Sequence, residues 1–308
     1  MKNAKLTIFF LSLVSLIACN KETIETPTIL PTSMDSLSVE PPIVTPTSMD
    51  SVAVAGPTIL AQLANNYEQL PEQAIAMSLD GSVYAQYAMP TDRYQHGILG
   101  DRVEGGQLVV VVDSIFYELT LEERYVFEDI RPRLYDVDSD GELEFICLRT
   151  HTALGGGIAI YKIIDEQLVE YAQVAEIGRS NRWLNIVAIN DLDNDRAVEL
   201  AWIETPHIGG TLKVAKIEEG MLQVLAETTF FSNHAIGERN LCLSVLTEQS
   251  NQKVIYVPTQ NRSKIVGFTF DSNQWQLFEE IDQAVDFSQT LVAQYNFTGL
   301  VEEEDNCI

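Results

Sequence analysis

Basic side chains are scarce in this sequence, and the motifs by which enzymes are usually recognised are missing. The 308 residues include 19 lysines and arginines against 45 aspartates and glutamates, a formal charge of −26. This balance disfavours nucleic acid as a partner, because phosphate backbones are bound by clustered basic side chains. A hydrophobic content of 46% disfavours a disordered acidic chain. The sequence contains no phosphate-binding loop, G-x-S-x-G, H-E-x-x-H or G-x-G-x-x-G motif.

Long hydrophobic runs are also missing, except at the N-terminus. Residues 6–18 form an apolar run behind two lysines, too short for a permanent anchor, so residues 1–18 predict a signal peptide. The run ends in Leu-Ile-Ala before Cys19 and resembles the bacterial lipobox. The resemblance implies a lipoprotein of the cell envelope, held to the membrane by lipid on Cys19. Because Asn20 and not Asp follows, we expect the outer membrane, with the periplasmic or surface face left open; an ordinary secretory signal is the alternative.

Aromatic residues are absent between Leu11 and Asn66, and six of the eleven prolines lie in residues 20–58. Such a segment cannot bury enough apolar area to offset the entropy of ordering it. We therefore predict a Pro/Thr/Ser-rich tether over residues 19–58, whose duplicated P-T-S-M-D-S unit is a spacer or, alternatively, a recognition motif. A short helix is expected over residues 59–72.

Long helical periods are missing from the rest of the chain, which instead repeats. Apolar strands that turn into a second alternating strand start at residues 108, 158, 212 and 265, just over fifty residues apart. A further strand pair precedes each of the last three hairpins, so one unit holds four antiparallel strands; in the last unit this pair is expected at residues 241–246 and 253–257. This predicts an all-β fold, a small β-propeller of four or five four-stranded blades over residues 73–300, followed by an acidic tail at 301–308. A β-sandwich or a solenoid is the alternative.

Two acidic loops interrupt the second and third units, at residues 136–144 and 191–199. Carboxylates at loop positions 1, 3, 5 and 9 can point inward at one hard cation, and position 7 can offer its carbonyl. An EF-hand would need its bidentate acid at position 12, where the two copies have Cys147 and Trp202. Solvated acidic turns are the alternative to a metal site.

The two loops resemble the calcium loop of FG-GAP repeats, which is also found in bacterial VCBS-repeat proteins and is related to the blades of the integrin alpha-chain propeller. The resemblance implies structural Ca²⁺ at one or two sites that rigidify the blades, and a binding function. Arg196 stands where glycine is expected, so a left-handed backbone there predicts a weaker second site. The ligands implied are Asp136, Asp138, Asp140, Glu144 and the Glu142 carbonyl for the first site, and Asp191, Asp193, Asp195, Glu199 and the Ala197 carbonyl for the second.

The histidines are few, and we assign no catalytic or cofactor-binding residue. His151 and His207 precede glycines at similar places in successive units, while His96 and His234 open similar segments before a strand, which we interpret as blade architecture. The predicted function is binding of a protein or polysaccharide through loops on one propeller face. The alternatives are a propeller hydrolase, lyase or dehydrogenase, or a structural subunit of an envelope assembly. Cys147 and Cys242 are expected to be buried in strands.

Overall fold

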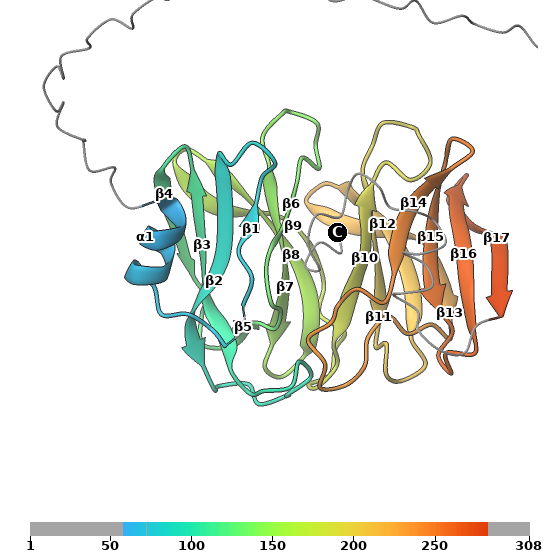
Figure 1. The fold of residues 1–308 in the computed structure, drawn as a ribbon, viewed down its shortest axis with the longest axis horizontal. Coiled ribbons are helices and arrows are strands. Elements are labelled where there is room, and N and C mark those ends of the chain that lie inside the picture. The colour runs from blue at the N-terminus through green and yellow to red at the C-terminus, as the bar shows by residue number, and fades with distance from the viewer. Residues whose placement is uncertain (1–57, 72, 283–308) are drawn as a thin grey trace, which may run out of the picture. The chain divides into compact units, whose positions relative to one another are not determined.

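The computed structural model describes residues 58–71 and 73–282; the predicted signal peptide, Cys19, most of the tether and the acidic tail lie outside them. The part of the chain so described contains one helix, α1 (Ile59–Asn66), and is otherwise built from strands (Figure 1). The hydroxyl of Thr58 accepts the N–H of Ala61 and begins the helix, and Leu63 buries it against the first blade. None of the described residues forms a helix with the length and apolarity needed to cross a bilayer.

Sixteen of the described strands fall into four antiparallel groups of four, or blades, and the fold is an all-β propeller, as predicted. Backbone pairing joins the first three blades into one 13-stranded sheet, while the fourth is a separate four-stranded sheet. The first two blades consist of β1 (Ala76–Met77), β2 (Val83–Thr91), β3 (Glu104–Val112) and β4 (Ile115–Thr120), then β6 (Arg133–Tyr135), β7 (Glu144–His151), β8 (Gly155–Ile164) and β9 (Gln167–Val174). The last two consist of β10 (Leu184–Asn190), β11 (Glu199–Glu204), β12 (Thr211–Glu218) and β13 (Met221–Thr229), then β14 (Val245–Gln249), β15 (Gln252–Pro258), β16 (Lys264–Asp271) and β17 (Gln274–Asp282).

A short strand, β5 (Tyr125–Phe127), connects the first two blades. It pairs with β3 through Phe127 and with β7 through all three of its residues. The second and third blades meet through a single parallel pair, Gln173 with Met221, between their outer strands.

Blades stack because the middle strands are apolar on both faces. In β7, Phe145 and Cys147 enter the core shared with the first blade, whereas Ile146 and Leu148 enter the core shared with the third. The two faces alternate because successive side chains of a strand point to opposite sides. The outer strand β17 alternates exposed and half-buried residues instead, as expected for a strand with one solvated face.

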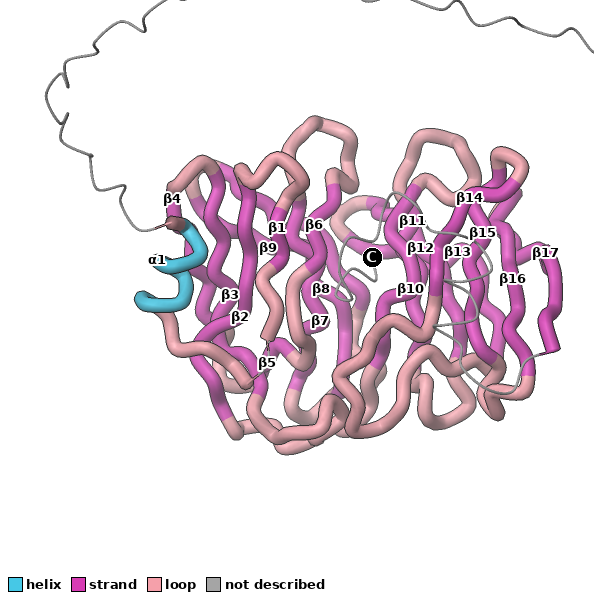
Figure 2. The backbone as a smooth tube through the Cα atoms, viewed as in Figure 1, coloured by secondary structure: helices cyan, strands magenta, loops and turns pink. Residues whose placement is uncertain are grey.

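The turns between strands collect at two ends of the propeller (Figure 2). The upper end, at the top of Figures 1 and 2, holds turns and loops 78–82, 113–114, 136–143, 165–166, 191–198, 219–220, 250–251 and 272–273. The lower end holds loops 92–103, 121–124, 152–154, 175–183, 205–210, 230–244 and 259–263.

Two predictions about the last blade are corrected by the structure. The strand expected to start at Leu241 starts at Val245, because the preceding residues belong to the lower-end loop, where the Asn240 side chain accepts the N–H of Cys242. Cys242 is therefore half-buried in a loop, and it is disulfide-bonded. Cys147 is a free thiol, fully buried in β7, as expected.

Candidate functional site

Loops from different blades meet at the centre of the lower end. The carbonyl of Ile98, in the first blade, accepts the N–H of Gly237, which precedes the fourth blade, at 2.9 Å. Asp101 and Arg239 form an ion pair between the same two loops. The hydroxyl of Tyr94 accepts the N–H of Asn181 at 2.7 Å, which adds the loop between the second and third blades. The contacts fix a floor built from residues far apart in sequence.

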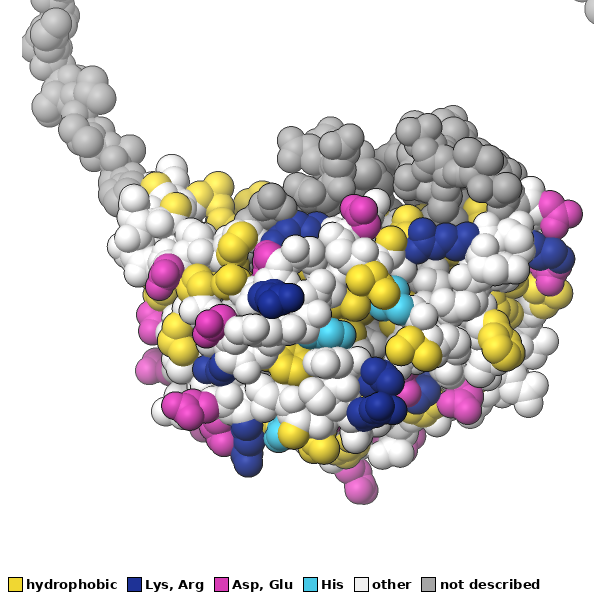
Figure 3. All heavy atoms as spheres, turned by 90° about the horizontal axis from the view of Figure 1, so that it is seen from below, with side chains coloured by type: hydrophobic (Ala, Val, Ile, Leu, Met, Phe, Trp, Pro, Cys, Tyr) yellow, Lys and Arg dark blue, Asp and Glu magenta, His cyan; other side chains and the backbone are white. Residues whose placement is uncertain are grey.

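This floor encloses a pocket of about 120 Å³. In the view from below, histidine side chains lie near the middle of the face beside apolar ones (Figure 3). The residues around the pocket come from four lower-end loops and are His96, Ile98, Asn181, Arg182, Trp183, Thr205, His207, Ile208 and Ile236.

One wall of the pocket is a chain of two neutral histidines. His207 Nε2 lies 3.0 Å from His234 Nδ1, and His234 Nε2 lies 2.7 Å from the carbonyl of Glu238. Since that carbonyl can only accept, His234 carries its proton on Nε2 and accepts from His207 on Nδ1. Burial lowers the pKa of both histidines to about 4. The Trp183 ring stacks on His207 at 6.1 Å and holds it in place.

A second wall contains a histidine backed by a buried carboxylate. His96 Nδ1 lies 2.6 Å from Glu128 Oε1, and the Thr150 hydroxyl donates to the other oxygen of Glu128 at 2.8 Å. Glu128 has no exposed surface, and burial raises the pKa of its carboxyl. The arrangement orients the imidazole and leaves Nε2 as its free nitrogen, since none of the described residues bonds that atom.

Further buried charge lies beneath this wall. Asp129 pairs with Arg133, and both are almost completely buried. Burial, together with the nearby charges of Glu128 and Asp101, raises the pKa of Glu104 to about 9. An acid that is neutral at physiological pH can share a dry site with two other carboxyls without strong repulsion.

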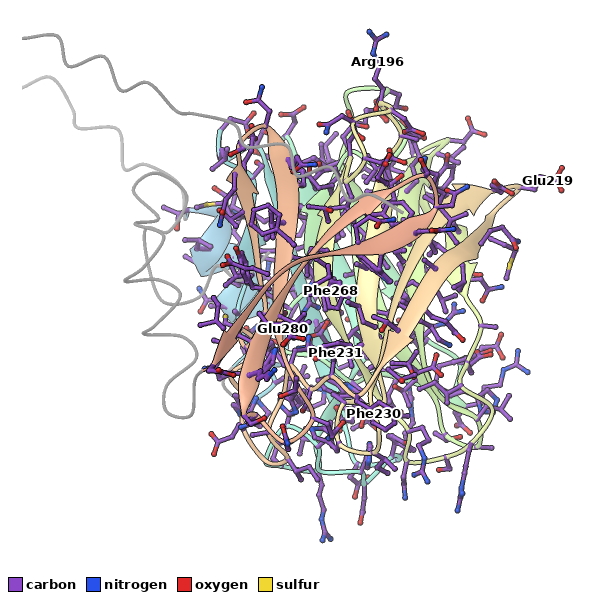
Figure 4. The ribbon with its side chains drawn as sticks, turned by 90° about the vertical axis from the view of Figure 1, so that its right-hand side faces the viewer. Arg196, Glu219, Phe230, Phe231, Phe268 and Glu280 are labelled. Atoms are coloured by element: carbon purple, nitrogen blue, oxygen red, sulfur yellow. The ribbon has the colours of Figure 1, made fainter. Side chains whose placement is uncertain are left out.

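Large apolar side chains stand exposed around the pocket mouth. Ile208 and Ile236 are 62% and 69% exposed, and both line the pocket. Phe230, 68% exposed, lies in the same lower-end loop as Ile236, and Figure 4 places it at the opposite end of the molecule from Arg196. Exposed apolar groups gathered at one mouth are typical of a binding surface.

Charge is divided unequally between the two ends. The lower-end loops balance seven arginines with six acids: Arg93, Arg102, Arg124, Arg179, Arg182, Arg239 and Arg262 against Asp92, Asp101, Glu122, Glu123, Glu176 and Glu238. The upper-end turns carry twelve acids and one base: Asp80, Asp113, Asp136, Asp138, Asp140, Glu142, Asp165, Glu166, Asp191, Asp193, Asp195 and Glu219 against Arg196. The acidity of the described blades is therefore concentrated away from the pocket.

The first acidic loop folds around its own aspartate. Asp136 accepts the N–H groups of Asp140 and Gly141 at 3.1 and 3.0 Å, and Asp140 accepts the N–H of Glu142 at 2.9 Å. Glu144 is fully buried and accepts the N–H of Val137 at 2.8 Å. The loop thus brings its carboxylates together as the spacing predicts.

The second acidic loop repeats this arrangement. Asp191 accepts the N–H groups of Asp195 and Arg196 at 3.0 Å each, and Glu199, also fully buried, accepts the N–H of Leu192 at 2.7 Å. Asp195 accepts the N–H of Ala197 at 2.9 Å. Arg196 has a φ of 77°, the left-handed conformation in which the first loop has glycine.

The carboxylates of each loop form a set that a divalent cation could use. One oxygen each from Asp136, Asp138 and Glu144 lies within 4.8 Å of the others, and the same holds for Asp191, Asp193 and Glu199. Three carboxylates suit Ca²⁺ in number and chemistry.

A lysine from the third strand of the same blade already reaches each carboxylate set. Lys162 Nζ lies 2.6 to 2.9 Å from Asp140, Asp138 and Glu144. Lys216 Nζ lies 2.5, 3.0 and 3.7 Å from Asp195, Glu199 and Asp193. A metal could enter only if the ammonium group moved, so the residues as arranged do not fit a calcium ion beside the lysine.

His151 and His207, which occupy similar places in successive units, have different surroundings in the structure. His151 ends β7, packs edge-on against Tyr125 at 5.1 Å and accepts the N–H of Ala153. His207 instead meets His234, and His96 lies across the pocket from them. The similar segments opened by His96 and His234 were the sequence signal for this site, because they contact each other through Ile98 and Gly237.

Among known proteins the chain has only distant structural neighbours. No protein-family model matches the chain, and no curated protein matches it. Among solved structures, the periplasmic gluconolactonase of Pseudomonas aeruginosa is similar at 14% identity and a TM-score of 0.39, over 68% of this chain and 53% of that one. The WD40 domain of SCAP from fission yeast is similar at 16% identity and a TM-score of 0.40, over 70% of this chain and 46% of that one. The chain thus spans about half the length of these neighbours.

Proposed function

We propose that this protein is a lipid-anchored binding module of the cell envelope, and that it takes its protein or polysaccharide ligand at the lower end of the propeller. The observation that carries the proposal is the pocket between His96 and His207, with Ile208 and Ile236 exposed at its mouth. Apolar groups around a small polar pocket supply contact area, and the fixed polar atoms supply specificity.

The charge distribution supports the same end. An envelope surface rich in anions is repelled by the acidic upper end, whereas the balanced lower end offers arginines such as Arg182 at the pocket. Electrostatic repulsion by an anionic envelope surface therefore opposes close contact less at the lower end than at the upper end.

A pair of substitutions at the pocket mouth tests the proposal. The full-length variant with Ile208→Asp and Ile236→Asp should capture its envelope ligand at least tenfold more weakly than the wild type, because two charges are placed in the contact. Leu79→Asp is the matched control, since Leu79 is fully exposed in the upper-end turn 78–82. Equal capture by all three proteins, with unchanged melting temperatures, would refute binding at the lower end.

A second candidate function is that of a propeller enzyme, favoured by the His96–Glu128 pair in the pocket wall. A histidine oriented by a buried carboxylate can act as a general base through its free nitrogen. Turnover of a glycan or an ester that is lost in His96→Gln, while the melting temperature is kept, would favour the enzyme over the binding module. Binding that persists in His96→Gln without turnover in either protein would favour the module.

A further inference from the structure

We propose that Lys162 and Lys216 are the resident cations of the two acidic loops, and that their ammonium groups take the place that the calcium-loop resemblance gives to Ca²⁺. The proposal concerns the upper end of the propeller and is independent of the ligand at the lower end.

The contacts of Lys162 match the donors that an ammonium group has. Nζ lies 2.6 Å from Asp140 Oδ2, 2.8 Å from Asp138 Oδ2 and 2.9 Å from Glu144 Oε1. Two of its N–H donors hydrogen-bond Asp138 and Asp140, and Glu144 faces Nζ as the third ion-pair partner. The side chain is almost completely buried and its Nζ lies over the Tyr171 ring at 5.5 Å, so the lysine is packed and not a solvated surface group.

The buried glutamates make a positive partner necessary. Glu144 and Glu199 have no exposed surface, and their Oε2 atoms are used by backbone N–H groups. None of the described residues hydrogen-bonds their Oε1 atoms with good geometry, but these atoms face Lys162 Nζ at 2.9 Å and Lys216 Nζ at 3.0 Å. A carboxylate taken out of water is strongly unfavourable unless a charge of opposite sign lies beside it.

The two blades without an acidic loop can be compared with the two blades that have one. Glu199 pairs directly with Lys216 across β11 and β12, and the register of β7 and β8 sets Glu144 opposite Lys162 in the same way. The first blade has no acidic loop of this kind, and none of the cross-strand pairs between β2 and β3 joins a glutamate to a lysine.

The fourth blade agrees with the first. Its β14–β15 turn is the two residues Ser250 and Asn251, and the register of β15 and β16 sets Val254 opposite Thr269 at the equivalent position. The lysine and the buried glutamate therefore occur together with the acidic loop and are replaced together where the loop is missing. A lysine present for another reason, such as solubility, would not follow the loop in this way.

A calcium ion and the ammonium compete for the same oxygens. A Ca²⁺ ion bound by Asp138 and Glu144 would need the same two oxygens that Lys162 Nζ now contacts, and two cations that share such close ligands repel each other. Occupation by metal thus requires the buried lysine side chain to leave its place.

Thermal melting of the full chain in chelator and in millimolar Ca²⁺ tests the proposal. The wild type should have the same melting temperature in both, and metal analysis after dialysis against Ca²⁺ should find less than one calcium per chain. Lys162→Met should melt roughly 10 °C lower in chelator, because it leaves buried Glu144 without a counter-charge. Calcium should recover part of this loss in the variant, since the vacated place is then open to a divalent ion.

The controls separate this loss from a general effect of removing a lysine. Lys253→Met removes a half-exposed lysine paired with Glu248 alone and should shift the melting temperature by no more than about 2 °C. Lys216→Met repeats the test in the other loop if Lys162→Met does not fold. A wild-type melting temperature that falls in chelator and returns with calcium, or two tightly bound calcium ions per chain, would overturn the proposal. A Lys162→Met protein as stable as the wild type would overturn it as well.

Discussion

At the scale of single residues, backbone conformation distinguishes the two acidic loops. Gly141 and Arg196 occupy the same loop position with φ of 90° and 77°, and a side chain in this region strains the backbone. Arg196 is exposed and points away from the upper end (Figure 4), so its side chain contributes little packing. Loop 191–198 therefore contains a strained arginine whose side chain does not contribute to the packing of the fold.

We expect Arg196→Gly to raise the free energy of unfolding by about 1 kcal/mol, because glycine adopts a positive φ without a clash. Urea unfolding followed by circular dichroism measures the change. The reciprocal variant Gly141→Ala should lower the free energy by a similar amount. If Arg196→Gly were neutral or destabilising, the arginine would be making a contact that the strain argument omits.

The two neutral histidines make stability depend on pH. Their folded pKa of about 4 lies below the ordinary value of 6.5, so the unfolded chain binds protons first as the pH falls. Their stabilising contribution is complete above about pH 6.5 and is lost progressively as the pH falls toward 4. For fully buried His234 the loss amounts to at most about 3 kcal/mol.

His234→Gln should therefore flatten the fall in unfolding free energy between pH 6.5 and 4. The control is His151→Gln, since His151 ends β7 and is bonded to neither His207 nor His234. Chemical denaturation at a series of pH values measures both slopes. A His234→Gln slope equal to that of the wild type would show that folding does not lower the pKa of this histidine.

At the scale of elements, the lower-end loops are held by close backbone approach. A Cβ on Gly210 would lie 1.9 Å from the carbonyl oxygen of Phe231 and 2.9 Å from Ile203 Cγ2. The N–H of Phe231 donates to the Gly210 carbonyl at 3.0 Å. This contact fixes loop 205–210, and with it His207, against loop 230–244.

Gly210→Ala should destabilise the protein by roughly 3 kcal/mol, because the two loops must separate to admit the methyl group. Gly209→Ala is the control: Gly209 has a φ of 71° but open space around it, so only about 1 kcal/mol is expected. Thermal or urea unfolding compares the two. Similar small losses for both would mean that loop 205–210 moves easily, contrary to a rigid pocket wall.

The elements themselves were predictable, and the contacts between them were not. Hairpins such as β8 and β9 follow from apolar strands separated by a polar turn, and the buried middle strands read as near-continuous apolar runs. The start of β14 was misplaced because apolar Leu241 belongs to the lower-end floor and not to a strand. A local sequence pattern shows that a residue is buried, but it does not show which element packs against that residue.

The candidate site was predictable only in part for the same reason. The acidic loops are local, so spacing alone found their carboxylates. Lys162 lies more than twenty residues from Asp138 and reaches it only through strand pairing, and Asp101 meets Arg239 across 138 residues. The register comparison among the repeats could have found the lysine, whereas nothing local predicts the floor of the lower end.

At the scale of the whole molecule, the fold places two different kinds of surface at its two ends. At the upper end, the acidic side chains of two turns lie around Lys162 and Lys216. At the lower end, histidines, arginines and exposed apolar side chains come together from several blades. The net charge of −26 is therefore a property of the whole sequence and does not describe the lower end, where the ligand is proposed to bind.

The central claim, that the ligand binds at the lower end, is tested most directly by site-specific photo-crosslinking in intact cells. A photo-reactive amino acid in place of Ile236, which is 69% exposed at the pocket mouth, should give a discrete adduct with an envelope component. The same substitution at Leu79, in the upper-end turn 78–82, should give none. A discrete adduct from Leu79 and none from Ile236 would contradict the account.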